Sequence, residues 1–185
     1  MSADWQLSVV IPVYNSAGSL TPLVERLRPV LEIHCDPYEV ILVNDGSTDG
    51  SWKVVEKLCQ QFSFVRGIDF LRNYGQHSAL LAGIRAAHYD VIVTIDDDLQ
   101  NPPEEIPRLL QMLAEGYDVV YGLPEHERHG LWRPLASRLT KRALKGAMGA
   151  ETAKLVSAFR VFRSSVRDAF MNYQSSYVSI DVLLT

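Results

Sequence analysis

The 185-residue chain has only two cysteines and no long apolar run. Cys35 and Cys59 lack metal-binding or redox spacing and lie in stretches of helical character, so we expect two buried, reduced thiols. There is no signal peptide and no run of 18 apolar residues, so no membrane-spanning helix is predicted. The sequence ends on the apolar run YVSIDVLLT without a cap, so we expect it to be part of a longer chain.

Two common nucleotide-binding signatures are also absent, because neither G-x-G-x-x-G after the first predicted strand nor a P-loop occurs. The net charge of −4 gives no reason to expect a nucleic-acid partner. The charge is uneven, however: ten of the 18 Lys and Arg residues lie within residues 128–167, where Glu151 is the single acid. This segment predicts an anionic partner or, alternatively, a solvated helix face.

Apolar strands alternate with amphipathic helices along most of the chain, which is 47% hydrophobic. This order predicts one α/β domain, a mostly parallel sheet with helices on both faces. After about Leu123 the pattern becomes helical and basic. The predicted strands are 7–14, 39–44, 65–71, 91–95 and 118–121, and the predicted helices begin at Ser19 or Thr21, span 49–62 and 76–87, and follow an Asn101–Glu104 capping box.

Ligands of open parallel sheets bind at the carboxyl ends of the strands. Polar residues follow four of the predicted strands, and we expect them to meet at one edge. For Gly46 and Ser47, selection by a turn is an equal alternative. These strand-end residues are Pro12, Tyr14 and Asn15; Asn44, Asp45, Gly46 and Ser47; Arg72, Asn73, Tyr74 and Gly75; and Asp96, Asp97, Asp98 and Gln100.

The stretch VTIDDDLQNPPEEIP places three carboxylates in a row after a strand. Their mutual repulsion and burial are costly unless a cation compensates them, and Mg²⁺ or Mn²⁺ prefers such oxygen ligands. If the strand geometry persists, Asp96 and Asp98 share one face and Asp97 takes the other. The alternative is an Asx-turn beside a helix N-terminus.

The motifs IPVYN, VNDGSTDGS, RNYGQHSAL and DDDLQNPPEEIP together resemble family 2 glycosyltransferases. The likeness is to the branch that acts on polyprenyl and dolichyl phosphates, including undecaprenyl-phosphate aminoarabinose transferase and dolichol-phosphate mannose synthase, and it extends to about Arg163. It implies a GT-A fold and inverting transfer from a nucleotide sugar. Residues 1–185 would form one catalytic domain, with a donor part (1–123) and an acceptor part (124–185) cut before membrane helices.

The resemblance also implies roles for single residues. Asp98 and Gln100 would hold the cation, with Asp96 as a further ligand, while Asp96 and Asp97 would lie near the nucleotide and sugar. Two positions depart from the family pattern: Ser16 stands where Glu is usual, and Asp97 where Ala is usual. The implied donor-binding residues are Pro12, Tyr14, Asn15, Val43, Asp45, Gly75, Asp96 and Asp97, and the implied catalytic residues are Asp96, Asp97, Asp98 and Arg133.

The basic segment would bind the acceptor. Arg133, Ser137 and Lys141 fall on one face of a predicted helix. The resemblance assigns Arg133 and Ser137 to the lipid phosphate. SAFR resembles a family SGFR motif beside the active site, which adds Ser157 and Arg160, although alanine replaces the glycine.

Two histidines are also considered as site residues. We expect His88 at a helix C-terminus, and leave open whether His77 touches a ligand.

The expected partners are a nucleotide-sugar donor (UDP-sugar favoured over GDP-sugar), a polyprenyl-phosphate acceptor and the membrane surface, with a homo-oligomer as an open alternative. Mg²⁺ or Mn²⁺ is the expected cofactor, and the cytoplasmic face of the membrane the expected location, although this piece itself would be soluble. One rival reading is a glycosyltransferase with a glycan or other non-lipid acceptor. Another is a receiver-type Mg²⁺-binding signalling module, although the fifth predicted strand lacks the lysine which that class requires.

Overall fold

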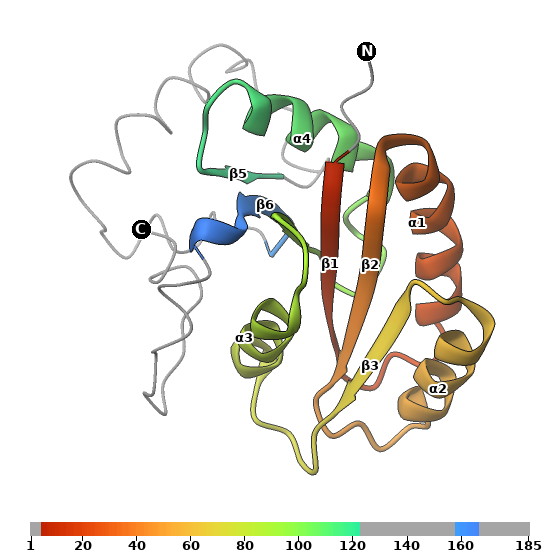
Figure 1. Ribbon diagram of the computed structural model, residues 1–185. Coiled ribbons are helices and arrows are strands. Elements are labelled where there is room, and N and C mark those ends of the chain that lie inside the picture. Colours follow the sequence, from red (N-terminus) through yellow and green to blue (C-terminus); the bar gives the residue numbers. More distant parts are fainter. Residues whose placement is uncertain (1–4, 123–157, 167–185) are drawn as a thin grey trace, which may run out of the picture.

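The computed structural model describes residues 5–122 and 158–166, which form a six-stranded sheet flanked by helices (Figure 1). Two short 3-10 turns, η1 (Pro103–Glu105) and η4 (Ser164–Val166), complete the described elements. The strands are β1 (Trp5–Val13), β2 (Cys35–Asn44), β3 (Val65–Asp69), β4 (Val91–Thr94), β5 (Val119–Tyr121) and β6 (Arg160–Arg163). The helices are α1 (Leu20–His34), α2 (Ser51–Gln61), α3 (Gln76–Ala86) and α4 (Ile106–Ala114).

The sheet has the strand order β3-β2-β1-β4-β6-β5. The β1–β2, β2–β3 and β1–β4 pairs are parallel, whereas β6 is antiparallel to both β4 and β5. The predicted mostly parallel α/β sheet is therefore confirmed. The strand β6 lies in the part of the chain that we expected to be helical, so the prediction is wrong for Arg160–Arg163.

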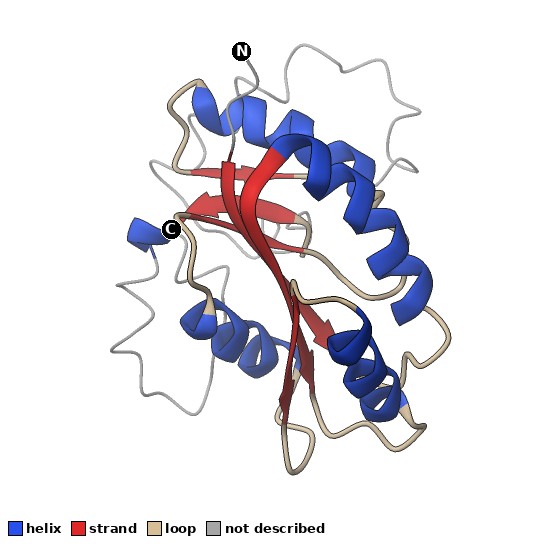
Figure 2. Ribbon diagram, turned by 45° about the vertical axis from the view of Figure 1, so that its right-hand side comes forward, coloured by secondary structure: helices blue, strands red, loops and turns tan. Residues whose placement is uncertain are grey.

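Successive residues of the central strands point to opposite faces of the sheet, so they contribute to two hydrophobic cores, one on each face. Val9 and Val40, which are partners in the β1–β2 register, pack with α1, α2 and α4. Their neighbours Val10 and Ile41 face the opposite side and pack against α3. Figure 2 shows helices on both sides of the sheet. Because both faces are covered, the central strands are apolar throughout, which explains why they stood out in the sequence.

Two local predictions are wrong. Cys35 begins β2 rather than lying in a helix, because Pro37 follows closely and cannot continue one. The capping box at Asn101 does not form: no side-chain cap is present, and α4 begins only at Ile106. The Glu104 carboxylate instead pairs with Arg26 of α1, at 2.7 and 3.0 Å.

Both cysteines are free. Cys35 is buried, and its burial raises the pKa of its thiol to about 12, whereas Cys59 in α2 is half-buried. Within the described part of the chain, no helix is both long and apolar enough to cross a bilayer.

Candidate functional site

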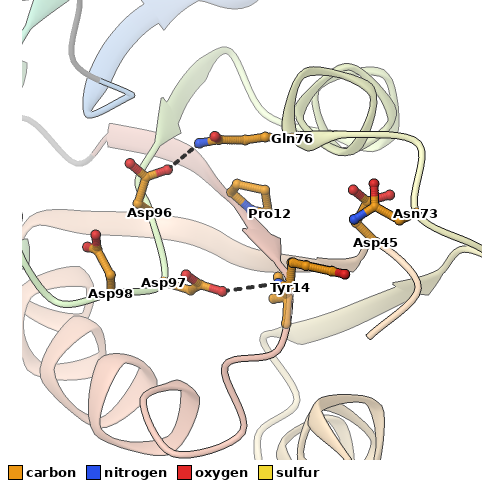
Figure 3. A pocket seen from close by; sticks show the side chains of 9 residues that line it. Pro12, Tyr14, Asp45, Asn73, Gln76, Asp96, Asp97 and Asp98 are labelled. Carbon is orange, nitrogen blue, oxygen red and sulfur yellow. Dashed lines mark hydrogen bonds between the residues drawn. The ribbon is translucent and has the colours of Figure 1, made fainter. Parts of the chain in front are cut away.

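A cavity of about 300 Å³ lies where the carboxyl ends of β1, β2 and β4 meet the N-terminus of α3 (Figure 3). Strand ends far apart in the sequence therefore come together, as the parallel topology requires. Val13 and Gln76 line the cavity although they were not among the predicted strand-end residues, whereas Asn73 was expected at this edge. The full lining comprises Pro12, Val13, Tyr14, Asp45, Asn73, Gln76, Asp96, Asp97 and Asp98.

The three successive aspartates bind three different partners. Strand geometry ends at Thr94, and the acids lie in the turn that follows. The Gln76 amide donates to Asp96 Oδ1 at 2.7 Å, and the Tyr14 backbone N–H donates to Asp97 Oδ2 at 3.3 Å. Asp98 Oδ1 accepts from the N–H of Gln100 at 3.0 Å. Figure 3 shows the Asp97 carboxylate directed toward Tyr14 and the Asp96 carboxylate toward Gln76.

Burial and mutual repulsion make this cluster electrostatically unfavourable. Burial, then the charges of Asp98 and Asp97, raise the pKa of Asp96 to about 6, although Arg160 and the Gln76 hydrogen bond oppose the shift. Burial also raises the pKa of Asp97, against hydrogen bonds from Ser16 and Tyr14. A cation near these carboxylates would relieve the repulsion and favour their charged forms.

The donor set fits a cation whose shell is completed by a ligand. Among residues 5–122 and 158–166, no three His, Cys, Asp or Glu side chains are grouped so that they could hold a metal by themselves. Mg²⁺ usually takes only one or two carboxylates and fills its shell with waters and substrate phosphates. Asp96 and Asp98 match that smaller requirement: burial and then the charges of Asp98 and Asp97 raise the pKa of Asp96, and a cation would counter both.

Asp45 is fixed by the start of α3. Its carboxylate is buried and accepts from the backbone N–H groups of Tyr74 at 2.6 Å and Gly75 at 2.8 Å. A carboxylate is favoured there because the helix N-terminus exposes unpaired N–H groups. The carboxylate thus holds the loop between β3 and α3 against the end of β2, while Asp45 still lines the cavity.

Gly46 is required by a close approach of two backbones. Its φ is +65°, and a Cβ there would lie 2.4 Å from the carbonyl carbon of Arg72. No larger side chain fits without moving the β3–α3 loop, so this residue does more than satisfy a turn.

The loops after β1 and β2 are tied together by hydrogen bonds. The Asn15 N–H donates to Ser47 Oγ at 3.0 Å, and Asn15 Oδ1 accepts from the Thr48 N–H at 2.8 Å. The Ser16 N–H donates to Ser51 Oγ at 2.8 Å. Tyr14 begins this loop with its side chain 51% exposed at the cavity. An exposed aromatic ring held on a fixed loop is suited to stacking against a planar ligand.

Other candidate residues lie outside the cavity. The Val43 side chain is fully buried in the core around α3, so a ligand could reach only its backbone. Gln100 is exposed. Gly75 is linked to the site by the hydrogen bond that its backbone N–H donates to Asp45.

His77 is half-buried and does not line the cavity. His88 follows α3, as expected. It lies beside the buried Glu39, which accepts from the His88 N–H at 2.8 Å and from Arg66 at 2.6 Å.

Arg160 lies in β6 with only 1% of its surface exposed. Its Nε donates to Thr94 Oγ1 at 3.1 Å, and its charge lowers the pKa of Asp96. A buried guanidinium therefore lies close enough to the acid cluster for its charge to act on Asp96. Its contact with an acceptor phosphate stays a prediction. Arg133, Ser137, Lys141 and Ser157 lie outside the described residues, and so does the predicted basic helix.

A family model described as Glycosyl transferase family 2 matches residues 8–171. Among curated relatives, an undecaprenyl-phosphate 4-deoxy-4-formamido-L-arabinose transferase of Yersinia enterocolitica is 38% identical over 179 residues, covering 96% of this chain and 55% of the relative. A protein of the same name from Serratia proteamaculans is 39% identical with the same coverage. The chain thus spans about half the length of the curated relatives it matches.

Solved structures share the fold. A mannosyltransferase from Pyrobaculum calidifontis, in complex with GDP-Man and Mn²⁺, superposes with a TM-score of 0.68 at 18% identity, covering 98% of this chain and 51% of that one. Glucosyl-3-phosphoglycerate synthase from Mycobacterium tuberculosis, in complex with Mn²⁺ and UDP-glucose, gives 0.61 at 22% identity, covering 88% and 57%. At these identities the likeness concerns the architecture, which is of the predicted GT-A type.

Proposed function

The chain belongs to glycosyltransferase family 2, and on this premise we propose that it transfers a sugar, with inversion, from a nucleotide-diphosphate sugar to a polyprenyl phosphate of the undecaprenyl type. The observation that carries the proposal is the acid-lined cavity at the strand ends, found in a chain 38% identical to a transferase named for that acceptor. A receiver-type module is no longer a competing reading, because the family match covers residues 8–171.

The donor would bind across the ends of β1 and β2. We assign its base and ribose to Pro12, Tyr14, Asn15 and Asp45, with backbone contacts from Val43 and Gly75. The half-exposed Tyr14 ring supports this placement, because aromatic faces stack well on nucleobases. A UDP-sugar is favoured over a GDP-sugar.

The diphosphate would lie beside the acid cluster. We assign Asp98, Gln100 and Asp96 to a Mg²⁺ or Mn²⁺ ion that, when bound, stabilises the negative charge of the departing nucleotide. The raised pKa of Asp96 supports the assignment, because burial and then the charges of Asp98 and Asp97 disfavour its ionised form, and a bound cation would offset both effects. Gln76 would keep the Asp96 carboxylate oriented through its 2.7 Å hydrogen bond.

The acceptor would approach from the basic segment. A phosphate monoester is largely a dianion at neutral pH, so it can attack the anomeric carbon without a strong general base. Catalysis then rests on positioning and charge, and we assign Arg133, Ser137, Ser157 and Arg160 to the acceptor phosphate. The reaction would take place at the cytoplasmic face of the membrane, where each well-placed Lys or Arg contributes about 1 kcal/mol toward an anionic leaflet.

Transfer to a soluble glycan is the second candidate, since the same donor site would serve it. The test supplies radiolabelled UDP- and GDP-sugars with Mn²⁺ to two parallel acceptors, undecaprenyl phosphate in detergent and a soluble oligosaccharide. Label in the extracted lipid, lost in Asp98→Ala, supports the proposal. Label in the oligosaccharide alone contradicts it and establishes the second candidate.

A further inference from the structure

Asp97 differs from its neighbours in what it holds. Its Oδ2 accepts from the Tyr14 backbone N–H at 3.3 Å, so it connects the turn after β4 with the loop after β1. The Ser16 hydroxyl lies between two acceptors, the Tyr14 carbonyl oxygen at 3.0 Å and the Asp97 carboxylate. The Asp97 carboxylate is therefore occupied by the loop that carries Tyr14, whereas Asp96 is held by Gln76 (Figure 3).

The Ser16 side chain takes part in the same contact. It lies within hydrogen-bond reach of the Asp97 carboxylate, two residues after Tyr14. Asp97 is therefore joined to two residues of one loop, to Tyr14 through the backbone and to Ser16 through the side chain.

We propose that Asp97 is a positioning residue that holds the Tyr14 loop against the nucleotide cavity, and that Ser16 and Asp97 form a coupled pair. The functional part of this inference rests on the proposed donor site. Its hydrogen bonds join Asp97 to the loop after β1, whereas the proposed cation ligands are Asp98, Gln100 and Asp96. Hydrogen bonds to a charged acceptor are stronger than those between neutral groups. Losing them should therefore change the position of the loop measurably.

A mutant cycle tests the coupling through binding of UDP with Mn²⁺. Asp97→Ala removes the acceptor and Ser16→Glu brings two carboxylates together, so each single change should weaken binding by about tenfold. The double variant restores one carboxylate and should bind within about threefold of the unmodified protein. Asp97→Asn, which keeps an acceptor for the Tyr14 N–H, should bind nearly normally. Asp90→Ala, an exposed acid before β4, is the matched control.

Two results would overturn the inference. Additive losses in the double variant would show that the two residues act independently. Loss of the Mn²⁺ dependence in Asp97→Ala would make Asp97 a metal ligand.

The loop itself can be followed without nucleotide, by amide hydrogen exchange at Tyr14 measured by NMR. Asp97→Ala should speed this exchange by about tenfold, and Asp97→Asn should not. Unchanged exchange in Asp97→Ala would refute the tie. Failure of the unmodified protein to bind UDP or GDP would instead refute the proposed function, and the exchange result would still decide the role of Asp97.

Discussion

Replacing Asp96 with asparagine should make the nucleotide-free protein more stable at neutral pH. The pKa of Asp96 is raised from 3.8 to about 6, first by burial and then by the charges of Asp98 and Asp97. Between these two pH values the folded state holds a proton that the unfolded state has lost. The free energy of unfolding therefore falls as the pH rises through this window, and Asp96→Asn removes that loss.

The size of the effect follows from the shift. Each pKa unit corresponds to about 1.4 kcal/mol, so the full shift sets an upper limit of about 3 kcal/mol. We expect Asp96→Asn to gain about 1–3 kcal/mol at pH 7.5, because an amide oxygen can still accept from Gln76 and does not repel Asp98.

Urea unfolding at several pH values is the assay, with exposed Asp90→Asn as the control. The gain should be present at pH 7.5 and shrink toward zero as the pH falls below about 4, where Asp96 is protonated in both states. A variant that is no more stable than its parent at pH 7.5 would refute the electrostatic reasoning. A gain that does not depend on pH would refute it equally, by pointing to packing.

Three further predictions concern other parts of the fold. Gly46→Ala should lower the free energy of unfolding by about 1–3 kcal/mol, because its Cβ would meet the Arg72 backbone; an unchanged urea midpoint would contradict this. Burial raises the pKa of Glu39, but hydrogen bonds from the His88 N–H, Arg66 and Ser8 together outweigh it, so the pKa lies below 4.5. The stabilisation by Glu39 is present above pH 4.5 and is lost as the pH falls through the folded value. Glu39→Gln should therefore flatten the acid limb of the stability profile, and an unchanged limb in acid titration would count against the network. Asp98→Ala with Mn²⁺ should bind UDP only as well as the unmodified protein does in EDTA, and retained metal dependence in calorimetry would exclude Asp98 as a ligand.

The parallel part of the fold could be predicted because its strands are covered on both faces. Val9 and Val10 must both be apolar, which produces runs that are visible without a structure. The strand β6 was missed because it has four residues and an arginine at each end. The burial of Arg160 depends on Thr94 and Asp96, which lie more than sixty positions earlier in the sequence.

The sequence predicted which strand ends form the candidate site, but not which hydrogen-bond partner each carboxylate has. Acids and polar residues after parallel strands had to converge, and the cavity contains Asp45, Asp96, Asp97 and Asp98. The direction of each carboxylate could not be predicted from the sequence, because the strand ends at Thr94 and a turn sets the side-chain directions.

The role of Gln76 was hidden for a similar reason. Its reach toward Asp96 depends on where α3 begins, and that start is set by the bonds from Tyr74 and Gly75 to Asp45.

Calorimetric titration of UDP and GDP into the protein, each with Mn²⁺ and with EDTA, tests the proposed donor site at the acid cluster. UDP should bind in the presence of Mn²⁺, EDTA should abolish or strongly weaken this binding, and GDP should bind less well. A folded protein that binds neither nucleotide in the presence of Mn²⁺ would contradict the proposed donor site at the acid cluster.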